Sequence, residues 1–160
     1  MEFNSPTSGK LTLDEVYREI ERYIFNKPGF QYRLIIGTDS QTWEQQVCFV
    51  TAVIIYRIGK GGRFFYHQEE EKTNRSLRQR IFYETSRSLE VAGELTMKLS
   101  EAPEEIVDKL DMEIHLDVGR EGPTKELIKE VVGMVVGSGF NAKIKPDAYG
   151  ASKVADKYTK

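Results

Sequence analysis

Four acidic residues stand where a folded chain would have to compensate for their charge. Asp39 follows the apolar run 34–36, Glu84 lies within a helical pattern, Asp117 ends a second apolar run and Asp147 precedes the last predicted helix. A carboxylate at the end of a buried strand is costly unless a partner or a metal ion compensates for it. For Asp39 the alternative is an ordinary capped turn, because Asp and Ser are common turn residues.

Glu84 is placed by the periodicity of a long helix predicted over 76–99. One stripe of this helix recurs at spacings of three and four residues and consists of Leu77, Ile81, Glu84, Ser88, Ala92, Leu95 and Leu99. Glu84 therefore points toward the core or toward a cleft at its edge. The alternative is a helical salt bridge with Arg80, four residues earlier.

The elements that must position these acids follow from caps, turns and apolar runs. Residues 1–10 are predicted to be a flexible arm, and Thr12-Leu13-Asp14-Glu15 matches a capping box that opens a helix over 13–26. The glycine-rich stretch 59–62 predicts a turn within an antiparallel meander. The predicted strands are 32–41, 46–58, 63–68, 112–119 and 141–145, and the later helices are 76–99, a short turn within 104–109, 124–137 and 148–158.

This order predicts one α/β domain over residues 1–160. A meander followed by β-α-β crossovers implies a five-stranded mixed sheet, in the order 3-2-1-4-5, with helices on both faces and an additional N-terminal helix. Ligands of such sheets gather at the carboxyl ends of parallel strands, where Asp39, Asp117 and Asp147 would lie and which Glu84 can reach. Clustered carboxylates repel and need cations, and Mg²⁺ or Mn²⁺ prefers oxygen ligands. Two such ions about 4 Å apart can support phosphodiester hydrolysis.

The order of elements and the placement of the acids resemble the ribonuclease H-like fold. More narrowly, the chain resembles the bacterial YkuK-type family of ribonuclease H-like proteins over nearly its whole length. The segments that carry this resemblance are Ile36-Gly37-Thr38-Asp39-Ser40-Gln41, Leu77-Arg78-Gln79-Arg80-Ile81 with Glu84-Thr85, His115-Leu116-Asp117-Val118-Gly119, and Lys143-Ile144-Lys145-Pro146-Asp147-Ala148.

The resemblance implies a nuclease that uses two divalent metal ions. Asp39 would bridge both ions, and Glu84, Asp117 and Asp147 would complete the metal site. Asp156 is the other candidate for the fourth acid, although it lies nine residues beyond Asp147, roughly 13 Å along a helix. Asp147 also fits a plain helix N-cap.

Several other residues are candidates for accessory roles. His115 shares a strand face with Asp117, and it either binds metal or moves protons, or it is a structural histidine. The loop after residue 119 leads to a helix start and suits a phosphate, although it also fits an ordinary βα loop. The candidate phosphate-binding residues are Arg120, Thr124, Lys125 and Lys145. Further local positive charge comes from Arg75, Arg78, Arg80 and Lys143.

The bulk composition bounds the class of protein. The net charge of −2 excludes binding to nucleic acid through bulk charge alone but allows a local basic patch. The single Cys48 permits no intramolecular disulfide bond. The polar first ten residues do not form a signal peptide, and no apolar run is long enough to span a membrane, so we expect a cytoplasmic protein.

Two classes of function remain open from the sequence. The first is a metal-dependent nuclease that acts on RNA, an RNA–DNA hybrid or structured DNA. The second is a non-catalytic module on the same fold that binds nucleic acid or a protein, because a fold does not fix a function. A small-molecule phosphohydrolase would require a closed pocket.

Overall fold

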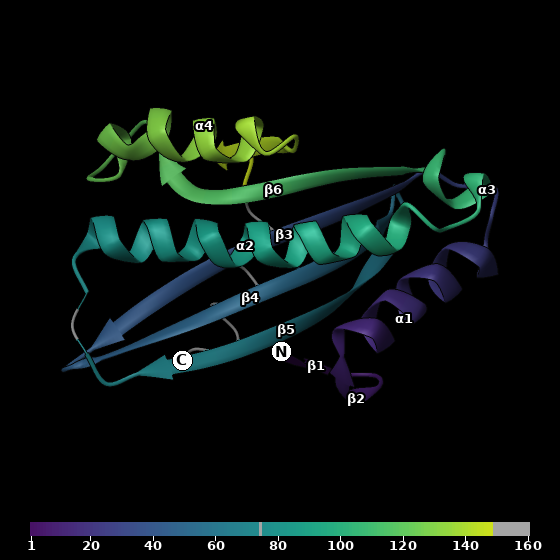
Figure 1. Ribbon diagram of the computed structural model, residues 1–160, viewed down its shortest axis with the longest axis horizontal. Helices are drawn as coiled ribbons and strands as arrows, with labels where there is room; N and C mark the ends of the chain where they lie inside the picture. The colour runs from purple at the N-terminus through teal and green to yellow at the C-terminus, as the bar shows by residue number, and fades with distance from the viewer. Residues whose placement is uncertain (74, 149–160) are drawn as a thin grey trace.

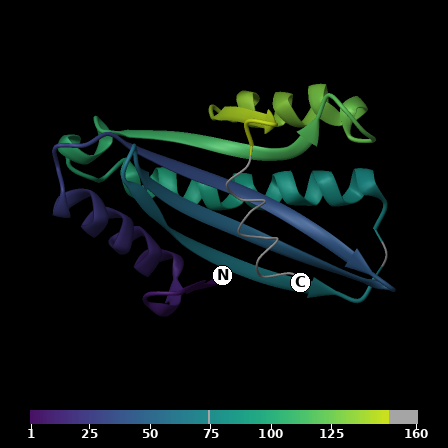
Figure 2. The same cartoon turned by 180° about the vertical axis from the view of Figure 1, so that it is seen from behind.

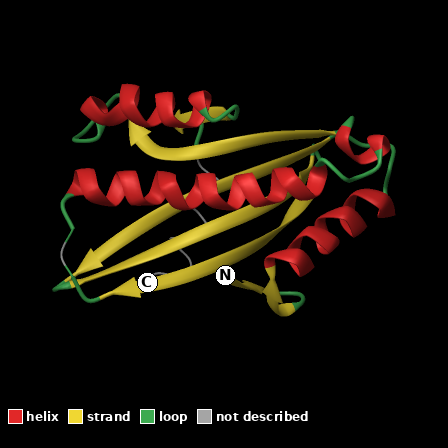
Figure 3. Ribbon diagram, viewed as in Figure 1, coloured by secondary structure: helices red, strands yellow, loops and turns green. Residues whose placement is uncertain are grey.

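The computed structural model describes residues 1–73 and 75–148, which form a mixed sheet with helices packed against it (Figures 1 and 3). The seven strands lie in the order β2-β1-β5-β4-β3-β6-β7. The strands are β1 (Glu2–Ser5), β2 (Gly9–Thr12), β3 (Tyr32–Trp43), β4 (Gln46–Arg57), β5 (Gly61–Glu71), β6 (Leu110–Gly119) and β7 (Asn141–Lys145). The helices are α1 (Leu13–Asn26), α2 (Leu77–Leu99), α3 (Glu104–Val107), the 3-10 turn η1 (Lys125–Leu127) and α4 (Ile128–Gly137).

The first twelve residues form a β-hairpin, so the prediction of a flexible arm over 1–10 was wrong. Phe3 is fully buried and pairs with Leu11 across the hairpin, and Asn4 pairs with Tyr66 of β5. The Ser5 hydroxyl accepts hydrogen bonds from the two backbone amides that close the turn. A strand of only four residues shows too little alternation of apolar and polar residues to be recognised from the sequence. The contacts with β5 that hold the hairpin in place come from a distant part of the chain.

The two added strands also change the sheet that the sequence predicted. Five strands in the order 3-2-1-4-5 were expected, but the sheet has seven strands and its order therefore differs. The expected strands occupy the part β5-β4-β3-β6-β7, and the hairpin extends the β5 edge. The antiparallel meander of β3, β4 and β5 and the parallel pairings β3–β6 and β6–β7 make the sheet mixed.

The helices bury one face of the sheet. The buried residues of α1, α2 and α4 join a single core cluster with alternate residues of the central strands, including Leu34, Ile36, Ile114 and Leu116. Figure 2 shows the same sheet from behind. Helices on both faces were expected from the β-α-β crossovers, but the described helices α1, α2 and α4 pack into one core on a single face. The helix predicted over 148–158 lies, beyond Ala148, outside the described residues.

Local sequence signals account for the starts of α1 and α2. The capping box predicted at Thr12 and Glu15 is present, with both reciprocal hydrogen bonds formed. A second capping box joins Ser76 and Gln79 at the start of α2. Among the described helices, none has the length and apolar character required to cross a membrane.

Candidate metal centre

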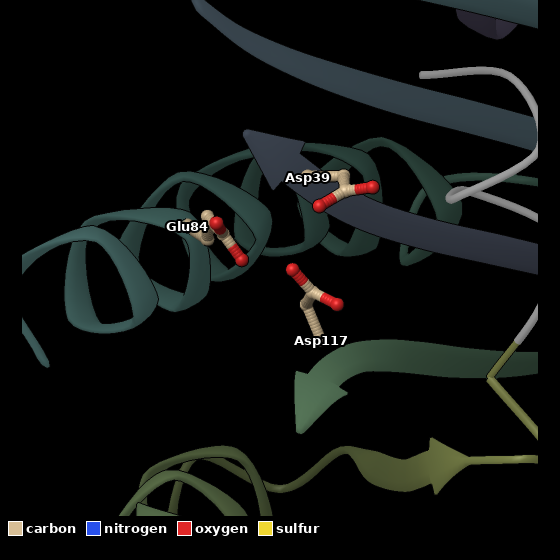
Figure 4. Close-up of side chains that lie close together, drawn as sticks. All are labelled: Asp39, Glu84 and Asp117. Carbon is tan, nitrogen blue, oxygen red and sulfur yellow. The ribbon is translucent and has the colours of Figure 1, made fainter. Parts of the chain in front are cut away.

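Three of the four predicted acids come together at one end of the sheet. Asp39 of β3, Glu84 of α2 and Asp117 of β6 each offer a carboxylate oxygen, and these oxygen atoms all lie within 4.8 Å of one another. Figure 4 shows the three side chains pointing toward a common point from three separate elements. Glu84 and Asp117 lie 45 and 78 positions after Asp39 in the chain. The parallel pairing of β3 with β6 and the packing of α2 on both strands bring the three acids together.

The strands separate where the acids meet. The parallel pairing of β3 and β6 ends at Gly37 and His115, so Asp39 and Asp117 each lie two residues beyond the last pair. The pairing of β6 with β7 also shifts its register between His115 and Gly119. Since strand alternation puts Asp39 and Asp117 on the face opposite α2, this opening lets Glu84 reach them from the helical side.

Glu84 is almost fully buried and only partly satisfied. Its exposed fraction is 3%, and the Ser40 hydroxyl donates a hydrogen bond of 2.5 Å to its Oε2 atom. Arg80 donates to the Ser40 hydroxyl at 3.2 Å, and no ion pair joins Arg80 to Glu84 in the described part of the chain. The Oε1 atom of Glu84 is buried and has no hydrogen-bond partner there. The prediction that Glu84 points inward is confirmed, and the alternative of an Arg80 salt bridge is not found.

The proximity of the acids changes their protonation. The pKa of Asp39 is raised to about 8, mainly by burial and then by the hydrogen bond with Asp117 and the negative charge of Asp117. Burial, followed by the charges of Asp117 and Asp39, raises the pKa of Glu84 well above its ordinary range. The backbone amide of Ser40 donates to Asp39 at 2.8 Å and opposes this rise. The cluster therefore holds protons near neutral pH when no cation neutralises it.

Lys145 supplies one such positive charge from β7. Its Nζ atom lies 2.5 Å from Oδ1 of Asp117. Burial on its own lowers the pKa of Lys145, but the hydrogen bond and the charge of Asp117 raise it overall, so the ammonium stays charged. The sequence indicated Lys145 as a phosphate ligand, whereas in this structure it pairs with an acid of the cluster.

Asp147 does not belong to the cluster. It is exposed, and its backbone amide donates to the Ile144 carbonyl at 2.8 Å. It lines two cavities, one shared with His115 and the other with Arg120 and Lys145. The competing candidate, Asp156, lies outside the described residues. The identity of a fourth acid therefore stays a prediction.

The loop that follows β6 is partly as expected. The Thr124 hydroxyl accepts a hydrogen bond from the Gly119 amide at 3.0 Å and so closes the loop. Arg120 and Lys125 are exposed, and α4 is preceded by the 3-10 turn η1. Arg120 and Lys145 line a cavity of about 510 Å³.

His115 contacts a partly buried Glu113–Arg33 ion pair that the sequence did not reveal. Its Nε2 atom is 3.1 Å from Oε1 of Glu113, and Nε of Arg33 is 3.4 Å from Oε2 of the same carboxylate. Burial lowers the pKa of His115, while Glu113 opposes the change. The alternation of β6 places Glu113, His115 and Asp117 on one face, which is the signal by which Glu113 was detectable. That Arg33 would be the partner of Glu113 could not be predicted, because it follows from the register in which β3 pairs with β6.

The three acids fit a hard divalent cation. Every donor is a carboxylate oxygen, the donors converge, and the unpartnered Oε1 of Glu84 is a buried acceptor that a cation would satisfy. Such a cation would also offset the repulsion that raises the pKa values of Asp39 and Glu84. Asp39, Glu84 and Asp117 are the residues that would hold it.

Comparison with known proteins places the chain in a family. The family model described as ribonuclease H-like matches residues 15–160, and the chain belongs to this family. It is also 35% identical over 168 aligned positions to the "Uncharacterized protein YkuK" of Bacillus subtilis (strain 168), covering 99% of this chain and 96% of that protein. The resemblance inferred from the acidic motifs is thus confirmed. No solved structure matches the chain.

Proposed function

We propose that the protein is a divalent-metal-dependent nuclease that hydrolyses phosphodiester bonds in RNA, an RNA–DNA hybrid or structured DNA. The observation that carries this proposal is the convergence of Asp39, Glu84 and Asp117, from three elements, on one point of a ribonuclease H-like fold. Mg²⁺ or Mn²⁺ bound in pairs by such carboxylates would activate water and stabilise the leaving oxygen.

The chain's own residues would divide the remaining work. Asp39, Glu84 and Asp117 would hold the ions, with Asp39 shared between them as the resemblance to ribonuclease H-like nucleases implies. Glu84 is held in place by the Ser40 hydroxyl, which Arg80 in turn contacts. Arg120 and Lys145 would contact the phosphate backbone from the cavity beside Asp117.

Asp147 remains the proposed fourth acid. It lines both the cavity that contains His115 and the cavity that contains Arg120, and its exposed carboxylate can approach a bound substrate. The Asp147→Asn variant tests this role, because a residue that only capped the helix predicted over 148–158 would change stability and leave the metal dependence of cleavage unaltered.

A nuclease panel tests the proposal directly. Single-stranded RNA, double-stranded RNA, an RNA–DNA hybrid and branched DNA are incubated with the protein and Mg²⁺ or Mn²⁺. We expect cleavage of at least one substrate and a loss of roughly 100-fold or more in Asp39→Asn. The matched control is Asp111→Asn, which changes an exposed carboxylate of the same strand as Asp117.

The binding module is the second candidate, and the Lys145–Asp117 ion pair favours it. A cluster neutralised by an internal ammonium needs less external cation. If Mn²⁺ fails to raise the melting temperature, and Asp39→Asn cleaves like the wild type, the nuclease proposal is wrong. Binding of the same nucleic acids without cleavage would then support the module.

A further inference from the structure

A cavity on the sheet face opposite α2 has no role in the proposal so far. Its volume is about 530 Å³, and its lining includes Arg33 and Ile35 of β3 together with Glu113 and His115 of β6. Along both strands, the next residues on this face are Gly37 and Asp39, and Asp117. The cavity and the acidic cluster therefore follow one another on a single face, and Gly37 contributes no side chain between them.

The cavity carries two positive charges that no acid among the described residues pairs with. Lys143 projects from β7, where it pairs in register with His115, and Lys60 lies in the turn between β4 and β5. Both are exposed, and neither forms an ion pair within the part of the chain that the structure describes. By contrast, Arg33 is engaged with Glu113 at 3.4 Å. Two free ammonium groups at one cavity favour an anionic ligand.

One wall of the cavity is apolar and aromatic. Ile35 is buried in a small cluster with Ala52 and Ile54, and Tyr56 packs against this cluster and lines the cavity. Ile58 extends the wall and is 44% exposed. An aromatic ring beside branched aliphatic side chains offers a stacking surface for a nucleobase, as in proteins that bind single strands.

The Glu113 carboxylate adds a fixed hydrogen-bond acceptor. Its two oxygen atoms are held from opposite sides by Arg33 and His115, which fixes the orientation of the carboxylate. With an exposed fraction of 14%, it is accessible from the cavity. A carboxylate in this position accepts hydrogen bonds from the amino group of a base or from a sugar hydroxyl.

We propose that this cavity binds the nucleotide adjacent to the phosphodiester that the acidic cluster cleaves. The inference rests on the proposed nuclease function and adds the site that positions its substrate. Lys60 and Lys143 would contact the phosphate, Tyr56 would stack on the base, and Glu113 would accept a hydrogen bond from base or sugar. The volume lies within the range of roughly 300–1,000 Å³ of small-ligand sites. Two residues of strand, about 7 Å, separate His115 from Asp117, so the ligand would adjoin the cluster.

The test measures binding without turnover. Metal-free protein in EDTA is titrated with adenosine or uridine 5′-monophosphate, and separately with inorganic phosphate, while backbone amide shifts are followed by NMR. We expect both nucleotides to shift the amides around Lys60 and His115 and to bind about tenfold more tightly than phosphate. Lys143→Glu should weaken nucleotide binding about tenfold, and Tyr56→Leu should weaken binding of nucleotides but not of phosphate.

Lys129→Glu is the matched control, because it makes the same charge change at an exposed lysine of α4, away from the cavity. Equal effects of Lys143→Glu and Lys129→Glu would overturn the inference, and so would equal affinities for phosphate and nucleotides. In the cleavage assay we expect Lys143→Glu to raise KM while kcat stays close to the wild-type value. Cleavage with an unchanged KM overturns this inference alone, whereas nucleotide binding without any cleavage overturns the nuclease proposal.

Discussion

The pKa of Asp39 reflects how closely the carboxylates of the cluster approach one another. Its carboxylate is held near Asp117 and Glu84 in a partly dry environment, and burial with the Asp117 interaction raises its pKa from 3.8 to about 8. In the metal-free folded protein, this raised pKa keeps Asp39 protonated around neutral pH. In the unfolded chain Asp39 has its ordinary pKa. Because this differs from its pKa in the folded protein, the free energy of unfolding depends on pH.

The first prediction concerns this linkage. Between about pH 4 and pH 8 the unfolded state binds fewer protons than the folded state, so the free energy of unfolding of the metal-free protein should fall as pH rises. Asp39→Asn is neutral at every pH and should flatten this dependence, with a gain of at least about 1 kcal/mol at pH 8 and less at pH 5. Urea denaturation in EDTA at the two pH values measures it.

Asp111→Asn is the control for that prediction, because Asp111 is an exposed carboxylate of β6. A wild-type protein whose stability is constant from pH 5 to pH 8 would contradict the prediction, and so would an Asp111→Asn variant that flattens the curve as much as Asp39→Asn does.

At the scale of elements, the separation of β3 from β6 creates the site, and β7 adds the ammonium of Lys145. That ammonium lies 2.5 Å from Asp117 and competes with any external cation for the same carboxylate. We therefore expect Lys145, from the strand that completes this edge of the sheet, to lower the affinity of the cluster for a metal ion.

Lys145→Gln tests this tuning. Loss of the ammonium makes the cluster more negative, so we expect Mn²⁺ to bind roughly three- to fivefold more tightly, a modest factor because the lysine side chain is half exposed. The metal-free variant should melt at a lower temperature than the wild type. Calorimetric titration with Mn²⁺ measures the affinity, and Lys129→Gln controls for the change in overall charge. Weaker Mn²⁺ binding would instead mean that Lys145 maintains the geometry of Asp117.

The N-terminal hairpin supports a second prediction at this scale. Phe3 is fully buried in the main core, so Phe3→Ala should destabilise the protein by about 3–5 kcal/mol. Glu2→Ala, at the exposed neighbouring position, should change stability by less than about 0.5 kcal/mol. Urea denaturation separates the two variants. A neutral Phe3→Ala would mean that the first residues behave as the free arm their composition suggests.

Sequence patterns revealed the acids better than they revealed what surrounds them. Glu84 was found because helical spacing places it on an otherwise apolar stripe, and Asp39 because it interrupts an apolar strand. These are local signals. The pairing of Lys145 with Asp117 and of Arg33 with Glu113 depends on strand register and on side-chain reach between distant segments, which composition and spacing do not specify. The hairpin was missed because its order comes from its contact with β5.

At the scale of the whole molecule, the acidic cluster joins three elements that already share the main hydrophobic core. β3 and β6 are paired strands, and α2 joins them through side-chain packing and through the Ser40–Glu84 and Thr38–Ser88 hydrogen bonds to β3. A cation held by Asp39, Glu84 and Asp117 would bind only when all three elements are in place. Its binding free energy would therefore stabilise the native state as a unit.

This coupling predicts a concerted response to metal. At a free Mn²⁺ concentration of 100 times Kd, the free energy of unfolding should rise by about 2.7 kcal/mol. Hydrogen exchange at the slowly exchanging amides of β3, β6 and α2 should then slow about 100-fold, the factor to which about 2.7 kcal/mol corresponds. The three elements should respond alike, because their slowest exchange requires global opening. Asp39→Asn should lose this response in all three elements together. Protection confined to one strand, or an equal response in Asp39→Asn, would mean that the cation binds elsewhere and that the cluster is held together by its protons and Lys145.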